Sequence, residues 1–347
     1  MRRAGVEWAA ADGGIPTNLP DGRVAWLYGD TLTGRIQSDG SLAPGFGLVR
    51  NSMVIQQGRC FTPLMGGSQN ARTSLIPAPA GFWYWPSQGV VEQTGSGNVL
   101  RLFLYRMTTG DGGEFNFRLV DMQIATFSLP ALQLVDVRSL PTGIQSGPVD
   151  SWGASVLVDG STVYLYANGS GNRTSQDCDP DRERRVARVP LGQLTTGPWE
   201  FFDGANWSTN QATAAFLQFV ADTPPPATAC SVKPWDTLNA VRSPNGGYAA
   251  GGKLGELPPP HTNSLLGTEI SEWTAQAPQG PWHYRGKVAQ TSPPWPNPDD
   301  QYTYGARLLF DLPGGTPTML YSVNSFGPLG QNVWLYGVNF LNPSLPP

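Results

Sequence analysis

The feature that most constrains this chain is a hairpin pattern that recurs five times along its length. Each copy has an apolar strand, a tight turn, and a second apolar strand that ends near Tyr or a small residue. Turn dipeptides such as Asp21-Gly22, Asp159-Gly160 and Asn245-Gly246 supply the positive φ angles that two-residue hairpin turns need. The five copies span residues 15–29, 81–105, 152–167, 238–250 and 304–322.

The spacing of these hairpins predicts the architecture. Successive turns lie roughly 60–90 residues apart, which is enough for a four-stranded sheet and a connecting loop. We therefore expect an all-β chain, a five-bladed β-propeller that fills residues 1–347 as a single domain. We further expect the first strand of each blade to line the central funnel. A β-sandwich is the alternative, but it needs fewer spaced repeats than are present.

Further repeats follow two of the hairpins and support this interpretation. Strands are expected at 186–189 and 269–273, and each is followed by a near-copy of the same motif, at 197–201 and 280–284. Two matching features in consecutive units favour repetition over chance. A last strand at 332–337 is expected to lie beside the first blade, because closing the ring removes an open sheet edge.

Composition agrees with such a fold and excludes several classes of function. The chain has 42 Gly and 33 Pro, which suit many short strands joined by turns, and its 12 Trp suit aromatic blade cores or sugar stacking. The net charge of −4 gives no basic surface for nucleic acid. The absence of an 18-residue apolar run predicts that no segment spans a membrane. We expect a monomer.

The start of the sequence predicts little about export. Met1-Arg2-Arg3-Ala4 is not followed by an apolar segment, so no signal peptide is visible. We nevertheless expect an extracellular or cell-envelope protein, exported by another route or represented here after trimming.

Cysteine and histidine usage argues against metal or cofactor chemistry. Three Cys are present, and a single bridge between Cys178 and Cys230 is the pairing we consider. Only two His occur, which disfavours a zinc site and a His-based triad. The acidic segment 177–183 lacks the spacing of an EF-hand and is interpreted as a solvated loop. We expect no metal and no cofactor.

Two aspartates of the first hairpin are the best candidates for chemistry. Asp12 precedes the first strand, beside Gly13 and Gly14, and Asp30 ends the second strand. A hairpin folds these two ends toward each other, and cleavage of a glycosidic bond needs two facing carboxyl groups. From position alone, a structural role as turn or capping aspartates is the favoured interpretation of both residues.

The run from Ala11 to Thr31 resembles the opening of the bacterial endo-D-arabinanase family of glycoside hydrolases. The similarity extends to Arg50-Asn51-Ser52 and to Tyr321-Ser322-Val323-Asn324. It implies a five-bladed propeller that cuts arabinofuranose chains of mycobacterial-type cell walls, with an essential aspartate pair at Asp12 and Asp30. More loosely similar arabinanases and fructan-cleaving enzymes carry a third acid on a later blade, which has no assigned position here.

Further side chains at the ends of the expected inner strands are candidates for substrate binding. Asp150 could tune the pKa of a neighbouring acid by like-charge repulsion. Two Trp could stack on sugar rings or pack between blades. From the repeat, the candidates are Asp150, Trp152, Lys233, Trp235, Tyr304 and Arg307. The motifs of the resemblance add Asn51 and Asn324.

The sequence thus predicts a glycoside hydrolase acting on neutral furanoside polysaccharide, most specifically an endo-D-arabinanase acting on D-arabinan of arabinogalactan or lipoarabinomannan. Asp30, the more shielded group, is expected to be the acid and Asp12 the base or nucleophile, with the reverse assignment open. Retention or inversion is also open. The alternative is a non-catalytic propeller that binds carbohydrate or protein, because propellers serve both purposes.

Overall fold

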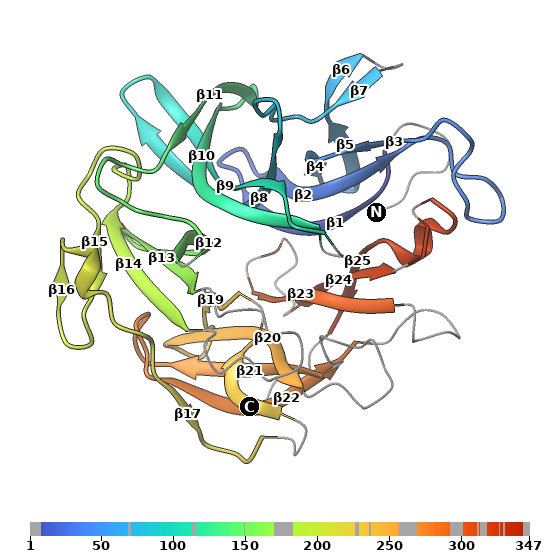
Figure 1. Ribbon diagram of the computed structural model, residues 1–347. Coiled ribbons are helices and arrows are strands. Elements are labelled where there is room, and N and C mark those ends of the chain that lie inside the picture. The colour runs from blue at the N-terminus through green and yellow to red at the C-terminus, as the bar shows by residue number, and fades with distance from the viewer. Residues whose placement is uncertain are drawn as a thin grey trace. The chain divides into compact units, whose positions relative to one another are not determined.

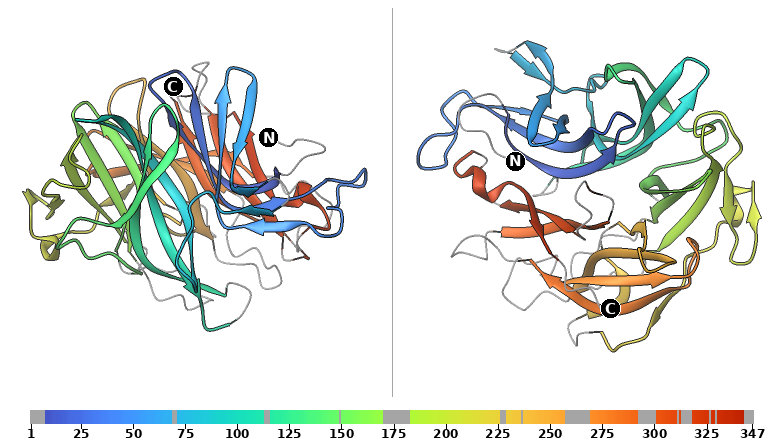
Figure 2. Two further views of the ribbon diagram at one scale, coloured as in Figure 1. Left: turned by 90° about the horizontal axis from the view of Figure 1, so that it is seen from above. Right: turned by 180° about the vertical axis from the view of Figure 1, so that it is seen from behind.

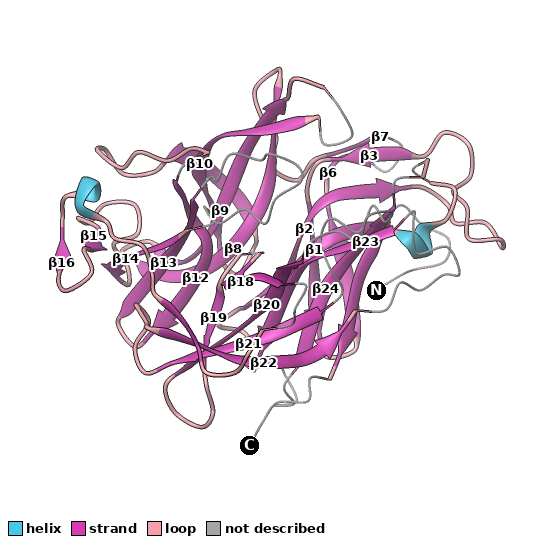
Figure 3. Ribbon diagram, turned by 60° about the horizontal axis from the view of Figure 1, so that its bottom comes forward, coloured by secondary structure: helices cyan, strands magenta, loops and turns pink. Residues whose placement is uncertain are grey.

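The computed structural model consists almost entirely of β-strands in the part of the chain that it describes. The only helices there are two 3-10 turns, η1 (Gln211–Thr213) and η3 (Val333–Leu335), drawn in cyan in Figure 3. The described residues are 8–68, 71–112, 116–148, 150–169, 183–225, 229–235, 237–256, 269–291, 301–310, 312, 318–325, 327–328 and 330–342.

The strands form five main sheets in chain order, the blades of a five-bladed β-propeller (Figure 1). The predicted fold class is therefore confirmed. Contacts along the backbone divide the chain into two compact units. The first unit comprises Met1–Ser139, Pro294–Gln301 and Ser322–Val338, and the second comprises Leu140–Pro293, Tyr302–Tyr321 and Asn339–Pro347.

The first sheet begins with the predicted N-terminal hairpin. Gly22 adopts a φ of 82° in the turn, which a residue with a side chain would reach only under strain. The sheet order is β1-β2-β4-β5, and β3 also pairs with β2. Its strands, with the adjoining β6–β7 ribbon, are β1 (Trp8–Asn18), β2 (Val24–Thr33), β3 (Gly47–Val49), β4 (Ser52–Gln57), β5 (Cys60–Leu64), β6 (Gly66–Ser68) and β7 (Ala71–Thr73).

The second sheet packs against the first. Its order is β11-β10-β9-β8, and β8 lies beside β1 and β2 in Figure 1 and in the turned views of Figure 2. Ile15 and Leu27 meet Leu102 and Phe127 in a shared apolar core. Burying each such side chain contributes about 1.5–3 kcal/mol. The strands are β8 (Phe82–Thr94), β9 (Gly97–Thr109), β10 (Phe117–Ser128) and β11 (Gln133–Ser139).

The third sheet opens the second unit and runs in simple chain order. The hairpin turn at Asp159-Gly160 connects its first two strands, as predicted, with Gly160 at a φ of 58°. Trp152 is fully buried and packs edge-on against Phe201 at 5.0 Å between ring centroids. The strands are β12 (Asp150–Asp159), β13 (Thr162–Gly169), β14 (Arg184–Pro190), β15 (Glu200–Phe202) and β16 (Trp207–Ser208).

The fourth sheet has the order β17-β22-β21-β20-β18, with β19 also paired to β20. β17 pairs with β22 in parallel, an arrangement that the hairpin repeat does not predict. Trp273 and Tyr284 of this sheet share an apolar core with Tyr166 of the third sheet. The strands are β17 (Phe219–Ala221), β18 (Ala229–Pro234), β19 (Asn239–Arg242), β20 (Tyr248–Glu256), β21 (Glu269–Ala275) and β22 (Trp282–Gln290).

The fifth sheet consists of β23 (Gln301–Leu309), β24 (Thr318–Ser325) and β25 (Gly337–Leu341), in that order. The strand predicted at 332–337 is wrong over most of its length. The Asn332 side chain accepts a hydrogen bond from the Trp334 amide at 2.9 Å, which starts the turn of η3 instead. The strand begins only at Gly337, and Val338 then packs closely against Gly14 of β1.

Two adjacent glycines in β20 provide a test of packing in the fourth sheet. A Cβ atom at Gly251 would lie 2.4 Å from Met319 Cε and 2.8 Å from Leu308 Cβ, whereas at Gly252 the nearest atom is 3.5 Å away. We expect Gly251→Ala to lower the free energy of unfolding by about 1–3 kcal/mol through overpacking.

The matched substitution Gly252→Ala should leave that free energy unchanged or raise it by up to about 1 kcal/mol. Urea unfolding followed by Trp fluorescence measures both variants. Equal stability of the two would contradict the packing seen here.

Candidate active site

A β-bulge in the first hairpin places the Asp12 side chain. The strand register pairs Ala11 with Thr31 and Gly13 with Tyr28, so the single residue Asp12 faces two residues of β2, Gly29 and Asp30. Gly13 and Gly14 have φ angles of 94° and 62°, which glycine adopts without strain. The Gly13 amide is held by the Ser322 hydroxyl at 3.0 Å. The Asp-Gly-Gly motif therefore has a specific backbone role.

The Asp12 carboxyl group lies directly over Gly29. A methyl group built on Gly29 would lie 2.8 Å from Asp12 Oδ1 and 3.5 Å from Trp85 Cδ1. The carboxyl group and the Trp85 indole thus approach each other over a residue without a side chain. Glycine at position 29 is what leaves room for this approach.

Asp30 reaches the same indole from the neighbouring position in β2. Its Oδ1 accepts a hydrogen bond from Trp85 Nε1 at 2.8 Å, and its Oδ2 accepts one from Arg50 at 2.8 Å. The Tyr336 hydroxyl donates to the Asp30 backbone carbonyl at 2.9 Å. The structure therefore brings both predicted aspartates to one place, around Trp85.

The surroundings of Asp30 act on its acidity in opposite directions. Burial raises the pKa of Asp30, because the charged form loses hydration. The Arg50 charge and the hydrogen bonds from Trp85 and Arg50 lower it, but burial is the largest effect and the pKa lies above its ordinary value. Asp30 is thus a shielded carboxyl group that holds its proton more readily than an ordinary aspartate.

The backbone near these residues is held by a buried polar chain. Trp8 Nε1 donates to the Ser52 hydroxyl at 3.0 Å, and that hydroxyl lies 2.8 Å from Thr31 Oγ1.

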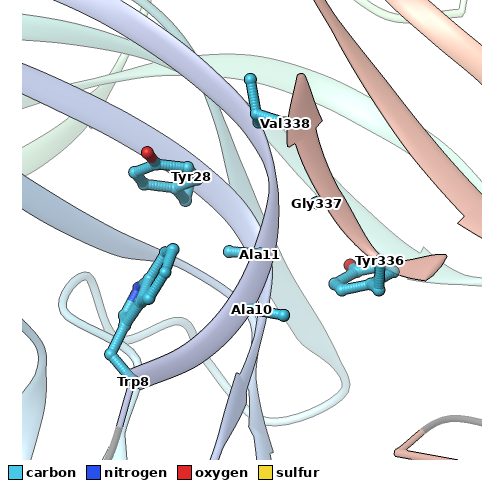
Figure 4. A pocket seen from close by; sticks show the side chains of 7 residues that line it. All are labelled: Trp8, Ala10, Ala11, Tyr28, Tyr336, Gly337 and Val338. Atoms are coloured by element: carbon cyan, nitrogen blue, oxygen red, sulfur yellow. The ribbon is translucent and has the colours of Figure 1, made fainter. Parts of the chain in front are cut away.

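A small cavity of about 10 Å³ lies beside β1, lined by Trp8, Tyr28, Tyr336 and their neighbours (Figure 4). It has room for about one water molecule and is too small for a sugar.

Asn51 is buried and holds the backbone of a neighbouring segment. Its Nδ2 donates to the carbonyls of Ile76 at 3.1 Å and Tyr84 at 3.0 Å, and its Oδ1 accepts from the Ile76 amide at 2.7 Å. The amide groups of this side chain are therefore engaged with backbone. Asn324, also in the first unit, is half-buried and accepts a hydrogen bond from the Ser325 amide at 2.7 Å.

The candidates of the second unit form two ion pairs of their own. Asp150 Oδ1 accepts a hydrogen bond from Arg185 at 2.5 Å, and Lys233 is paired with Glu183. Trp152 belongs to the blade core, and the Trp235 amide donates to the Lys253 carbonyl at 2.6 Å. Each of these four candidates therefore has a contact within the protein.

Two further candidates lie on β23. Tyr304 is half-buried and stacks on Tyr302 with 5.5 Å between ring centroids. Arg307 is buried, with 7% of its surface exposed. Tyr304 therefore packs against a ring of its own strand, and Arg307 is largely shielded from solvent.

Sequence reasoning missed the partners that make the aspartate pair a site. The sequence shows Arg50 only as part of a motif and Trp85 only as part of a hairpin, and neither pattern predicts a contact with Asp30. Separately, in the second unit, Glu272 of β21 is buried, and this burial raises its pKa to about 6. The sequence Glu269–Trp273 predicts a strand and gives no sign that Glu272 is buried. No local pattern distinguishes these three residues.

The structure describes only some of the residues on which the metal and disulfide predictions depend. Within those residues, no three His, Cys, Asp or Glu side chains gather where they could hold a metal ion. The 177–181 loop, Cys178 and the Cys230 side chain lie outside them. Cys60 is a free, exposed thiol. In the part that is described, no helix is long and apolar enough to cross a membrane.

Comparison with known protein families gives one match over most of the chain. The sequence profile of the family described as "Domain of unknown function (DUF5005)" matches residues 1–327. The chain belongs to this family. No curated protein sequence matches this DUF5005 member.

Solved structures share the fold of this DUF5005 member at low sequence identity. One is a presumed hydrolase from Bacteroides ovatus ATCC 8483, with a TM-score of 0.69 and 16% identity, covering 97% of this chain and 86% of that one. Another is the GH43_1 enzyme from Xanthomonas citri complexed with xylotriose, with a TM-score of 0.52 and 15% identity, covering 98% and 88%. The propeller architecture of the whole chain is therefore shared with these proteins.

The opposing influences on Asp30 can be separated by removing Arg50. We expect Arg50→Met to raise the pKa of Asp30 further, because a nearby positive charge that favours the carboxylate is lost. Carboxyl-detected NMR titration measures the pKa directly. Arg23→Met, which removes the cation of the exposed Asp21 pair, is the control and should leave Asp30 unchanged. A lower Asp30 pKa in Arg50→Met would contradict the assignment of these influences.

Proposed function

We propose that this DUF5005 member is a glycoside hydrolase that cleaves neutral furanoside chains, and specifically an endo-D-arabinanase acting on mycobacterial-type cell-wall arabinan. The observation that carries the proposal is the meeting of Asp12 and Asp30 at Trp85, where burial raises the pKa of Asp30. Glycoside cleavage requires a pair of carboxyl groups, one of which carries a proton. The arabinan specificity rests on the resemblance of residues 11–31 and 50–52 to the endo-D-arabinanases.

The fold adds support at the level of reaction class. The GH43_1 enzyme of similar fold was solved with xylotriose, an oligosaccharide. Propellers also serve as binding scaffolds, so this likeness contributes less than the carboxyl pair. The composition of the chain agrees with a neutral polymer as the substrate, since no strongly basic surface is expected at a net charge of −4.

We assign the acid role to Asp30 and the base or nucleophile role to Asp12. The acid must carry a proton at the working pH, and the pKa of Asp30 is raised by burial. Its proton goes to the glycosidic oxygen as the bond to the anomeric carbon breaks. Arg50 limits the rise, which keeps Asp30 acidic enough to release that proton. Asp12 then acts on the opposite side, on water or on the anomeric carbon.

Substitution of either aspartate tests the pair. Asp12→Asn and Asp30→Asn should each lower kcat on mycobacterial arabinogalactan by roughly 10²–10⁴-fold, because the amide can neither donate nor accept the proton. The thermal midpoint should change little, since the partly exposed Asp30–Arg50 pair contributes on the order of 0–1 kcal/mol.

Released oligosaccharides measure the rate in these variants. Asp21→Asn is the control, because Asp21 forms an exposed ion pair with Arg23 at the far turn of the same hairpin. A rate near that of the unmodified protein in either site variant would remove that residue from the catalytic pair and favour a binding scaffold.

Gly29 provides a test that leaves both carboxyl groups in place. Gly29→Ala introduces a methyl group 2.8 Å from Asp12 Oδ1, so the carboxyl group must move. Because a displacement of about 1 Å can cost on the order of 10²-fold in rate, we expect a loss of that size in kcat. Gly95→Ala is the matched control, with no atom within 4 Å of its new methyl group. Full activity of Gly29→Ala would refute the assigned position of Asp12.

A further inference from the structure

A second hollow lies next to Asp30 and is absent from every expectation drawn from the sequence. It has a volume of about 230 Å³ and lies between the 73–78 segment and the first residues of β8. We call it the Trp83 pocket. The lining residues that matter most to its chemistry are Arg50, Thr73, Ser74, Pro77, Phe82 and Trp83.

Arg50 connects the Trp83 pocket to the candidate active site. Its guanidinium group donates to Asp30 Oδ2 at 2.8 Å and lies 4.6 Å from the centre of the Trp83 ring. Trp85, two residues further along β8, donates to the other oxygen of Asp30. The same strand therefore supplies one aromatic ring to the aspartates and another to the pocket.

The wall of the Trp83 pocket is fixed by hydrogen bonds to the residues that follow β3. The Arg50 amide donates to the Ser74 hydroxyl at 3.0 Å, and the Leu75 amide donates to the Asn51 carbonyl at 3.2 Å. The buried Asn51 side chain binds the backbone of Ile76 and Tyr84. The pocket is thus preformed, which lowers the entropic cost of binding a ligand.

The chemistry of the lining selects a neutral, amphipathic ligand. Phe82, 37% exposed, and Trp83 offer aromatic faces, and Thr73 and Ser74 offer hydroxyl groups. Among the described residues of the lining, Arg50 is the one with a formal charge, and its guanidinium group is engaged by Asp30 Oδ2. A sugar ring matches such a surface, because its C–H face suits an aromatic ring and its hydroxyls suit polar groups. A volume below the ~300 Å³ of drug-sized sites fits roughly one sugar unit.

We infer that the Trp83 pocket is a subsite for one neutral sugar unit of the substrate, adjacent to the unit at Asp12 and Asp30. The inference rests on the proposed function for the identity of the polymer. It implies that at least two adjoining sugar units are held during cleavage, with Trp83 as the stacking platform and Arg50 between the two positions.

Equilibrium binding of an arabinofuranose hexasaccharide to the Asp12→Asn protein tests this, because that variant should not consume the ligand. We expect the Trp83 indole N–H signal in NMR spectra, identified by its loss in Trp83→Phe, to shift on titration. In the same background, Trp83→Ala should raise Kd by about tenfold, and Trp83→Phe by less. Trp207→Ala is the matched control, since Trp207 is also half-buried beneath an arginine, Arg188, at 4.4 Å.

An unshifted Trp83 signal, an unchanged Kd in Trp83→Ala, or no binding of the hexasaccharide overturns the inference. If Trp83→Ala weakens binding but the Trp83 indole signal does not shift on titration, the inference is also overturned. The weaker binding would then come from displacement of Arg50 and not from loss of a contact with the sugar. Cleavage is measured separately. If the Trp83 signal shifts but the protein does not cleave arabinan, the inference about the pocket stands and the proposed function is rejected. If the protein cleaves arabinan but the Trp83 signal does not shift, the proposed function stands and the inference about the pocket is rejected.

Discussion

The half-buried carboxyl group of Asp30 is the group on which the candidate site depends. A shielded polar group needs hydrogen-bond partners, and here they come from two segments remote from β2 in the sequence. Arg50 approaches from the residues that follow β3, and Trp85 approaches from β8 in the next sheet. Meeting the electrostatic demand of one side chain therefore fixes how the first two blades present their polar groups.

Several residues near Asp30 hold the geometry of the candidate site and take no part in the proposed chemistry. Asn51 adjoins Arg50 and is fully engaged with backbone, so its own contribution is to hold the segment that faces Trp83. Gly29 contributes by having no side chain where Asp12 and Trp85 converge. Polar groups that support the site outnumber those that could react, as is common where geometry must be held closely.

The parts of the fold governed by local chemistry could be predicted from the sequence. Turn glycines such as Gly22 and Gly160 determine where hairpins reverse, and this reversal brings Asp12 and Asp30 together. The two aspartates lie within the paired strands, at a bulge, and not at the strand ends that the sequence predicts. Arg50 and Trp85 could not be assigned, since their roles arise from packing between segments 20 and 55 residues away from Asp30. The turn at η3 was missed because a side-chain cap on Asn332 outweighs the strand preference of the residues that follow it.

The hydrogen bonds from the end of the chain to the first hairpin have a consequence for biosynthesis. Ser322 and Tyr336 bind backbone groups of Gly13 and Asp30, across 309 and 306 residues. During translation the aspartates emerge well before the residues that secure their backbone. A ribosome-bound or truncated chain therefore lacks the contacts that complete the site. Assembly of the candidate site therefore awaits synthesis of the segment that carries Ser322 and Tyr336.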